Sequence, residues 1–513
     1  MARDYRPVLR DQVMLLPVDM REWLPERHFV WFLLAVLDEL DVSAFEVGRQ
    51  RGGVGRQGFD PRMMLGLLVY GYSQGHRSSR RIEELCSTDV AFRVICAQDV
   101  PDHTTIARFR QSHASAIATL FVQVLELAGE AGLGRVGVIA VDGTRVAANA
   151  SWGKNRRRSW LRGKVEEAMA EAQRLDAEDD TRFGPEQGGE VDERWVDPRT
   201  RAAKIRAALA RTEEVAEHQA RAWEGKVDAW QGRLDKAQRQ HEITRAEMDQ
   251  RHRDYQQHRA AADRGEGPQP TGRPAPPADE AQLTRQAAAA VTRCRARRDK
   301  AAAQAAQERQ ARDPVANLTD PESGWMPTGK GWIQGYNAQL AVSADQLVLG
   351  VNVTNATGDA DQFGPMLILA GRGAEALNRG RARVGAAPQN IEQVLADAGY
   401  FTRNNLTLPG PDRLIAPTTR ERLEQRAQAA KHAHDSDSEP MPDPVAAMRA
   451  RLQQPDQIAR YRRRGVIVEP VNGHLKDRHG LRQYACRGMT ACQAETELAA
   501  ATANLLKIYR HKT

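Results

Sequence analysis

Two aspartates directly follow apolar, β-branched segments that are typical of buried strands. Asp142 follows residues 136–141 (VGVIAV), and Asp397 follows residues 391–396 (IEQVLA). Because ligand sites in open α/β sheets lie at the carboxyl ends of strands, this placement favours a binding role. A carboxylate there is costly to desolvate unless a cation compensates, and Mg²⁺ binds through one or two carboxylates and phosphate oxygens. Each aspartate taken alone is also explained as the cap of a strand-to-loop turn.

A third acid, Glu469, lies in a basic segment near the C-terminal end. It precedes Pro470, which suits the first turn of a helix and so predicts a helix that begins at Glu469. Lys476 follows seven residues later, two turns along the same face. The arginines at 462–464 precede the acid and could bind phosphates while Glu469 binds metal. A surface helix with an acid near its N-terminus, favoured by the helix dipole, is the alternative.

Three acids in these positions suit phosphodiester chemistry. Two divalent ions ~3.5–4 Å apart can activate an attacking hydroxyl group and stabilise the leaving oxygen of a phosphodiester. We therefore expect Asp142, Asp397 and Glu469 to converge in the fold, although 255 positions separate the first two.

The positive charge of the chain is concentrated near its C-terminal end. Residues 451–513 contain 12 Lys/Arg and five Asp/Glu, an excess equal to the net charge of +7 of the whole chain. Such a concentrated field favours a nucleic acid as partner, although an ordinary basic surface would also explain it.

The cysteine pattern and the lengths of the apolar runs indicate the cellular compartment of the protein. The five cysteines include no C-x-x-C pair, and no apolar run reaches the ~18 residues of a membrane span. The first 12 residues lack the apolar core of a signal peptide. We therefore expect a cytoplasmic protein with no membrane partner.

Residues 1–130 are predicted to be helical, with apolar helices over 29–40 and over 61–72, the latter capped by Asp60. In the segment 101–113, Asp102 or Thr104 can cap a helix that exposes Arg108 and Arg110. A short basic helix of this kind suits a helix-turn-helix-like DNA reader. A helical domain that serves only for packing is equally compatible.

Residues 152–320 differ in composition, because they are highly charged and rich in Ala, Gln, Arg and Glu. Long helices are predicted over 201–262 and 279–312, with a Pro/Gly linker near 264–278 between them. We interpret the segment as an antiparallel, coiled-coil-like helical hairpin inserted into another domain, because it has too few apolar residues for a core of its own.

Strand patterns return after the insertion. Residues 335–342 and 347–353 predict a hairpin, Asp359 or Asp361 is expected to cap a helix to Ala370, and strands are expected over 391–396 and 413–416. Residues 420–444 look loose, and helices broken near Gly465 and Gly480 complete the chain. This order predicts a ribonuclease H-like α/β core formed by residues 131–151 and 321–513.

Several segments in this order resemble a known family. The chain is similar to bacterial insertion-sequence transposases of the DDE class, in the group whose third carboxylate lies in a Tyr-Arg-Glu-Lys signature. The matching segments are Val141–Thr144, Gly335–Gln339, Leu395–Tyr400 and Tyr461–Lys476, together with Gly55–Pro61 and Asp102–Arg110 in the N-terminal block. The resemblance spans most of the chain outside 152–320 and 420–445.

Two positions depart from the family pattern. Four residues separate Arg464 from Glu469, where three are usual, so Arg462 or Arg463 could take the role of Arg464. Many relatives have an aromatic residue where Asn472 stands. The spacing between Glu469 and Lys476 fits the signature.

The resemblance implies metal-dependent DNA cleavage at element ends, followed by strand transfer into target DNA. Asp142, Asp397 and Glu469 would bind two Mg²⁺ or Mn²⁺ ions, and Lys476, the fourth catalytic residue, would hold phosphate. A set of basic and aromatic side chains would bind DNA: Arg108, Arg110, Tyr461, Arg462, Arg463 and Arg464. The partners would be double-stranded terminal repeats and target DNA, bound by a homodimer or a larger assembly.

Three other functions remain open at this point. A metal-dependent nuclease would retain the three acids without rejoining DNA. A transposase-derived DNA-binding protein would retain the N-terminal block and the basic end. A coiled-coil structural protein would explain only residues 201–312 and leaves the acids that follow the strands unexplained.

Overall fold

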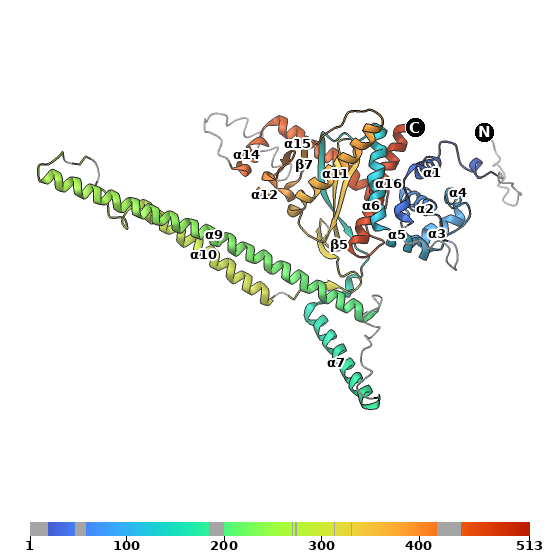
Figure 1. Ribbon diagram of the computed structural model, residues 1–513, viewed down its shortest axis with the longest axis horizontal. Coiled ribbons are helices and arrows are strands. Elements are labelled where there is room, and N and C mark those ends of the chain that lie inside the picture. The colour runs from blue at the N-terminus through green and yellow to red at the C-terminus, as the bar shows by residue number, and fades with distance from the viewer. Residues whose placement is uncertain are drawn as a thin grey trace, which may run out of the picture. The chain divides into compact units, whose positions relative to one another are not determined.

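The computed structural model describes residues 19–46, 58–183, 200–268, 270–271, 274–311, 313–329, 331–417 and 443–513. The chain divides into two compact units, one of Met1–Lys154 with Glu322–Thr513 and one of Asn155–Pro321 (Figure 1). The expected loose segment at 420–444 and the motif start at 55–57 lie almost wholly outside the described residues. A separate DNA-binding domain over residues 1–130 stays a prediction.

The first unit begins with helices, as the sequence predicts. Besides two short 3₁₀ turns, η1 (Met20–Glu22) and η2 (Ser43–Phe45), the helices are α1 (Phe29–Glu39), α2 (Pro61–Ser73), α3 (Ser79–Thr88), α4 (Val90–Ile95), α5 (His103–Ser112) and α6 (Ala114–Glu130). The Asp60 carboxylate accepts hydrogen bonds from two N–H groups in the first turn of α2, and Asp102 does the same for α5. Both predicted caps are therefore confirmed.

A six-stranded mixed sheet lies in the same unit. Its strands are β1 (Val138–Ala147), β4 (Gly324–Thr328), β5 (Gly331–Ser343), β6 (Val348–Thr354), β7 (Gln393–Ala396) and β8 (Asp412–Ile415). The order is β4-β5-β1-β7-β8, and β6 also pairs with β5. The pairs β1–β5 and β5–β6 are antiparallel, whereas β1–β7 and β7–β8 are parallel. The predicted hairpin is β5–β6, and the two later predicted strands are β7 and β8.

Helices join the sheet to the N-terminal helices in one hydrophobic core. Helix α11 (Phe363–Arg383) approaches α6 so closely that a Cβ at Gly380 would collide with the backbone of Glu126, which only glycine avoids. Helix α16 (Met489–Lys512) contacts α1 through the rings of Phe29 and Tyr509, whose centroids are 5.3 Å apart. A buried ion pair between Arg77 and Glu495 adds a second link between the two ends of the chain.

Two helix boundaries differ from the predictions. Helix α11 begins after a 3₁₀ turn (η5, Ala360–Gln362) with Gln362 as N-cap and no side-chain cap bond, so neither Asp359 nor Asp361 caps it. Helix α15 (Pro455–Asp477) runs unbroken through both Gly465 and Pro470. Its buried residues Ile467, Val468, Val471 and Leu475 follow helical spacing, and their burial overrides the local preference to stop. Helix α14 (Pro444–Arg451) precedes α15, and the break at Gly480 is present, with a φ of +69°.

The second unit contains α7 (Arg158–Phe183), α9 (Arg201–Asp263) and α10 (Gln282–Ala311), and a short antiparallel pair, β2 (Asn155–Arg157) with β3 (Val315–Asn317), joins its ends. Helices α9 and α10 lie side by side as an antiparallel hairpin (Figure 1), with contacts from Arg298 to Gln231 and from Arg245 to Asp279. The long helices expected here are present. Within the described ranges, no helix is long and apolar enough to cross a membrane.

Candidate active site

Asp142 and Asp397 lie side by side at one edge of the parallel part of the sheet. The last register pair between β1 and β7 joins Val141 to Ala396, and the two aspartates are the next residues on the two strands. The expectation that Asp142 ends its strand is wrong, because β1 continues to Ala147 by pairing with β5. Asp142 instead marks the point where the pairing with β7 stops. Asp397 ends β7 as predicted, and its Oδ1 accepts a hydrogen bond from the Gly399 N–H at 2.9 Å.

Burial of these two carboxylates shifts their titration. The Asp142 side chain is 15 % exposed, and burial raises its pKa to about 6 against the opposing effect of Arg464. Burial likewise raises the pKa of Asp397, and Arg464 again opposes the shift. The negative charge of Asp397 contributes to the raised pKa of Asp142. A nearby positive charge stabilises the ionised form of two partly desolvated acids that lie side by side.

Helix α15 provides that charge through Arg464. The Arg464 Nη1 lies 3.4 Å from Asp142 Oδ2, and its Nη2 lies 3.9 Å from Glu469 Oε1. The guanidinium group therefore lies between the two carboxylates. Glu469 is 65 % exposed and lies inside α15, so the prediction that it begins a helix is wrong, for the reason of burial given above.

No group of three or more His, Cys, Asp or Glu side chains that could hold a metal ion occurs in the part of the chain that the structure describes. At this edge, the Arg464 guanidinium lies within 4 Å of both Asp142 and Glu469.

Amide oxygens extend the set of oxygen donors at this edge. Asn472, from α15, donates a hydrogen bond through Nδ2 to Asp142 Oδ2 at 3.1 Å, while its buried Oδ1 has no hydrogen-bond partner. Two carboxylates and an unpaired amide oxygen are the hard donors that Mg²⁺ and Mn²⁺ prefer. In the chemistry of its donors, the site therefore fits a divalent cation.

Asp359 is a further functional candidate, which the sequence patterns indicate only as a possible helix cap. Its Oδ1 accepts hydrogen bonds from Asn337 Nδ2 and Gln339 Nε2, both at 2.7 Å, and forms an ion pair with Arg145 at 3.3 Å. A usable signal was present, since Asn337 and Gln339 are two residues apart on β5 and must therefore share one face of the sheet.

The Asp359 carboxylate also contacts the two segments that carry the buried aspartates. A Cβ added to Gly143 would lie 2.7 Å from Asp359 Oδ1. A Cβ added to Gly399 would lie 3.0 Å from Asp397 Oδ1 and 3.1 Å from Asp359 Oδ2. Asp359 therefore lies against the residue that follows Asp142 and beside Asp397 itself.

The basic signature residues divide between the site and the surface. Arg462 and Arg463 are exposed, whereas Arg464 faces the acids and hydrogen bonds with the buried Tyr461. Among the three arginines, Arg464 is thus the one at the site despite its unusual spacing from Glu469. Lys476 is half-buried; burial lowers its pKa, and the nearby Asp142 opposes this.

The N-terminal arginines also differ from each other. Arg108 is exposed on α5, as expected. The expectation that Arg110 is exposed is wrong, because it is 5 % exposed and donates hydrogen bonds to Tyr72 Oη at 3.3 Å and to the Arg77 carbonyl at 2.8 Å. Arg110 lies one turn after Ile106 and so shares the buried face of α5. Its guanidinium is buried and makes its hydrogen bonds inside the protein.

Comparison with protein families gives two matches. Residues 18–112 match a family described as Transposase domain (DUF772), and residues 421–509 match one described as Transposase DDE domain. No curated protein and no solved structure matches the chain. The first match contains α1 to α5, and the second contains Arg464, Glu469 and Lys476 on α15. The two matches support a transposase function for this chain, that of an insertion-sequence transposase of the DDE class.

Proposed function

We propose that this protein is a DNA transposase that cleaves DNA at the ends of its element and joins the freed 3′-hydroxyl group to target DNA. The observation that carries the proposal is the adjacency of Asp142 and Asp397 at the edge where β1 and β7 stop pairing. Helix α15 brings Glu469 and Arg464 to the same edge. The transposase family matches at both ends of the chain support the same activity.

We infer that the sheet is a ribonuclease H-like core. The support is its strand arrangement, in which the antiparallel strands β6, β5 and β1 are followed by β7 and β8 in parallel with β1. The first aspartate lies on the central strand β1 and the second at the end of its parallel neighbour. Residues Asn155–Pro321 would then be an insertion between β1 and the remaining strands.

Asp142, Asp397 and Glu469 would hold two Mg²⁺ or Mn²⁺ ions, as transposases of this class generally use divalent metal. Bound ions supply Lewis acidity for the attacking hydroxyl group and the leaving oxygen. Asn472 orients the Asp142 carboxylate, because its amide donates to Oδ2. Arg464 neutralises the buried acids before DNA binds, and Lys476 and Arg464 then bind phosphate. Arg462, Arg463 and Arg108 are exposed and bind DNA outside the site.

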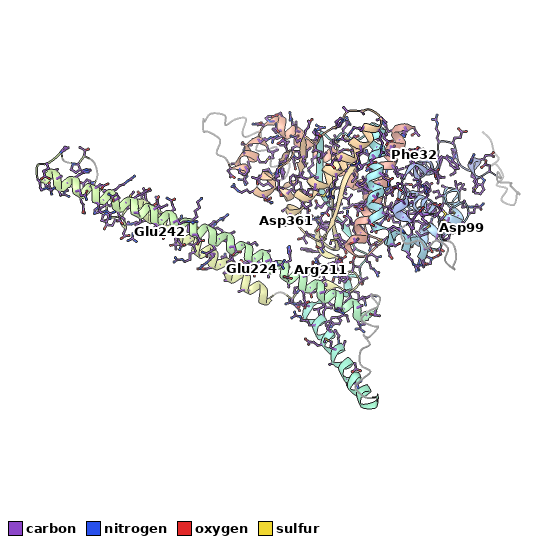
Figure 2. The ribbon with its side chains drawn as sticks, viewed as in Figure 1. Phe32, Asp99, Arg211, Glu224, Glu242 and Asp361 are labelled. Carbon is purple, nitrogen blue, oxygen red and sulfur yellow. The ribbon has the colours of Figure 1, made fainter. Side chains whose placement is uncertain are left out.

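The test is a cleavage and joining assay with duplexes that carry the terminal repeats of the element, in Mg²⁺ or Mn²⁺. Asp142→Asn and Asp397→Asn should each lower both products by roughly 10³-fold or more, while the variants still bind DNA. Asp361→Asn is the matched control, because Asp361 (labelled in Figure 2) is an exposed aspartate two residues from Asp359. Full activity of Asp142→Asn would refute the site.

The same assay separates transposition from simple hydrolysis. We expect both cleaved ends and joined products from the wild-type protein, formed by a homodimer or larger assembly on DNA. Cleaved ends without any joined product, at all target concentrations, would instead identify a metal-dependent nuclease.

A further inference from the structure

The helical hairpin of the second unit carries a dense group of basic side chains on one part of its length. Between Glu224 and Glu242, both labelled in Figure 2, α9 carries Lys226, Arg233, Lys236 and Arg239. The facing part of α10 adds Arg293, Arg297 and Lys300, because Arg298 and Gln231 are in contact across the hairpin. All seven side chains are exposed. These seven residues are called the hairpin basic face below.

Helical spacing separates this face from the nearby acids. Lys226 and Arg233 are seven residues apart, which is about two turns, so they lie on the same side of α9. Asp228 and Asp235 each come two residues after one of them and so point roughly 200° away. Arg239, four residues after Asp235, lies toward that other side and marks the margin of the face. Arg293, Arg297 and Lys300 are spaced by four and three residues and likewise share one side of α10.

The ring of Trp230 lies close to one arginine from each of the two helices. The Arg233 Cζ lies 4.5 Å and the Arg297 Cζ 5.1 Å from the centre of the Trp230 ring, although the two arginines belong to different helices. Cation–π attraction offsets part of the repulsion between these like charges. Within the described part of the hairpin, no acid forms an ion pair with any of the seven.

Other exposed arginines of the same unit do have acidic partners. Arg221 pairs with Glu217, Arg245 with Asp279, and Arg264 with Glu266. The basic face leaves its own charges available to a partner of opposite charge over about 20 Å of helix. A duplex presents one negative charge per ~1.7 Å of its axis and matches such a row.

We propose that the hairpin basic face is a further DNA-binding surface, which binds the phosphate backbone of double-stranded DNA without reading its sequence. The proposal rests on the proposed function for the identity of the polyanion. Long, exposed Lys and Arg side chains suit phosphate contacts, which position a protein on DNA without base selection. The surface lies in a different unit from the acids and does not depend on them.

The test compares two triple variants of the full chain. Arg233→Gln, Arg293→Gln and Arg297→Gln together remove three charges from the basic face. Arg221→Gln, Arg245→Gln and Arg264→Gln together remove three paired charges from the same unit and are the matched control. Gln has nearly the helix propensity of Arg, so both variants should retain helicity by circular dichroism. A second face variant, Lys236→Gln with Arg239→Gln and Lys300→Gln, leaves the Trp230 contacts intact.

Fluorescence anisotropy with a random duplex at several KCl concentrations gives the dependence of log Kd on log salt. Each face variant should lower the slope by about 0.9 per lost phosphate contact, up to ~2.7 for three, while the control stays near the wild-type slope. Equal slopes for face variants, control and wild type would overturn the proposal. A stronger loss of binding to an RNA duplex than to DNA would overturn the choice of DNA.

The proposed function can fail independently of this surface. Asp142→Asn should lose cleavage yet retain the wild-type salt slope, and the face variants should show the reduced slope even on DNA that is never cleaved. A wild-type protein that binds no duplex at all would overturn both proposals.

Discussion

Charges at the sheet edge and charges on the hairpin are in different physical situations. At the sheet edge a few carboxylates are largely buried, and burial raises the pKa of Asp142 to about 6. On the hairpin, a typical pair such as Arg221 with Glu217 is 73 % and 63 % exposed. A buried charge costs several kcal/mol unless a partner is present, whereas an exposed pair is screened by solvent. Single substitutions at the sheet edge should therefore have large effects. On the hairpin, a measurable effect should require the loss of several charges together.

Removal of the buried charge itself should have the largest effect and tests this difference between the two regions most strongly. The Asp142 carboxyl titrates near 3.8 when unfolded and near 6 in the fold, so the folded state binds its proton more tightly. Its favourable contribution to folding is complete below about pH 4 and is lost as pH rises through 6. At pH 7.5 in EDTA, Asp142→Asn should therefore be more stable than wild type by roughly 2–3 kcal/mol.

Denaturant unfolding at pH 5 and at pH 7.5 measures this effect. The advantage of Asp142→Asn should be larger at pH 7.5 than at pH 5. Mg²⁺ should stabilise the wild-type protein more than the variant, since only the wild type offers the full carboxylate set. A variant less stable than wild type at pH 7.5 in EDTA would show that the attraction of Arg464 outweighs the desolvation of the Asp142 carboxylate.

A smaller effect is expected from the hydrogen-bond network of Asp359, which lies against the buried aspartates. Asp359→Asn keeps the size of the side chain but weakens acceptance from Asn337 and Gln339 and the pair with Arg145. Because changes to groups that orient metal ligands typically cost 10–100-fold, we expect cleavage to fall by about that factor. The loss should appear in kcat and in the Mg²⁺ concentration needed for half activity, with little change in Kd for DNA.

A purely structural role of Asp359 would give a different result. Asp359→Asn would then lower stability without altering the metal requirement of the active fraction. Asp361→Asn again controls for the loss of one negative charge in this segment, and it should leave both readouts unchanged.

Local pattern was sufficient to predict strands β1, β5, β6, β7 and β8, and to place Asp142 and Asp397 where β1 and β7 stop pairing. The β-branched runs that end at Val141 and Ala396 predict buried strands, and residues that follow such strands meet at one edge of a parallel sheet. The extension of β1 beyond Asp142 was not predictable in this way. It depends on pairing with β5, almost two hundred residues later in the chain.

Other features depend on tertiary contacts, which local sequence patterns do not predict. Gly465 signals a helix break and Pro470 a helix start, yet the buried face of α15 keeps the helix continuous through both. Arg110 looks like an exposed base beside Arg108, but helical phase places it on the inner face of α5, against Tyr72. Asp359 acquires its role because β5 presents Asn337 and Gln339 to it. The spacing of these two residues indicates that they share one face of the sheet, but not that Asp359 reaches that face.

The smallest predicted effect lies on the hairpin. Arg221→Gln removes the i,i+4 pair with Glu217, in which both side chains are largely exposed. Such pairs contribute about 0.3–0.5 kcal/mol, and Gln retains most of the helix propensity of Arg. We therefore expect the free energy of unfolding to fall by no more than about 0.5 kcal/mol, with the difference shrinking further in 1 M KCl as salt screens the pair. Urea unfolding followed by circular dichroism at low and high salt measures both quantities. A loss above ~1.5 kcal/mol that persists in high salt would show that Arg221 contributes to stability as strongly as a buried charge such as Asp142. The difference between the two regions would then no longer hold.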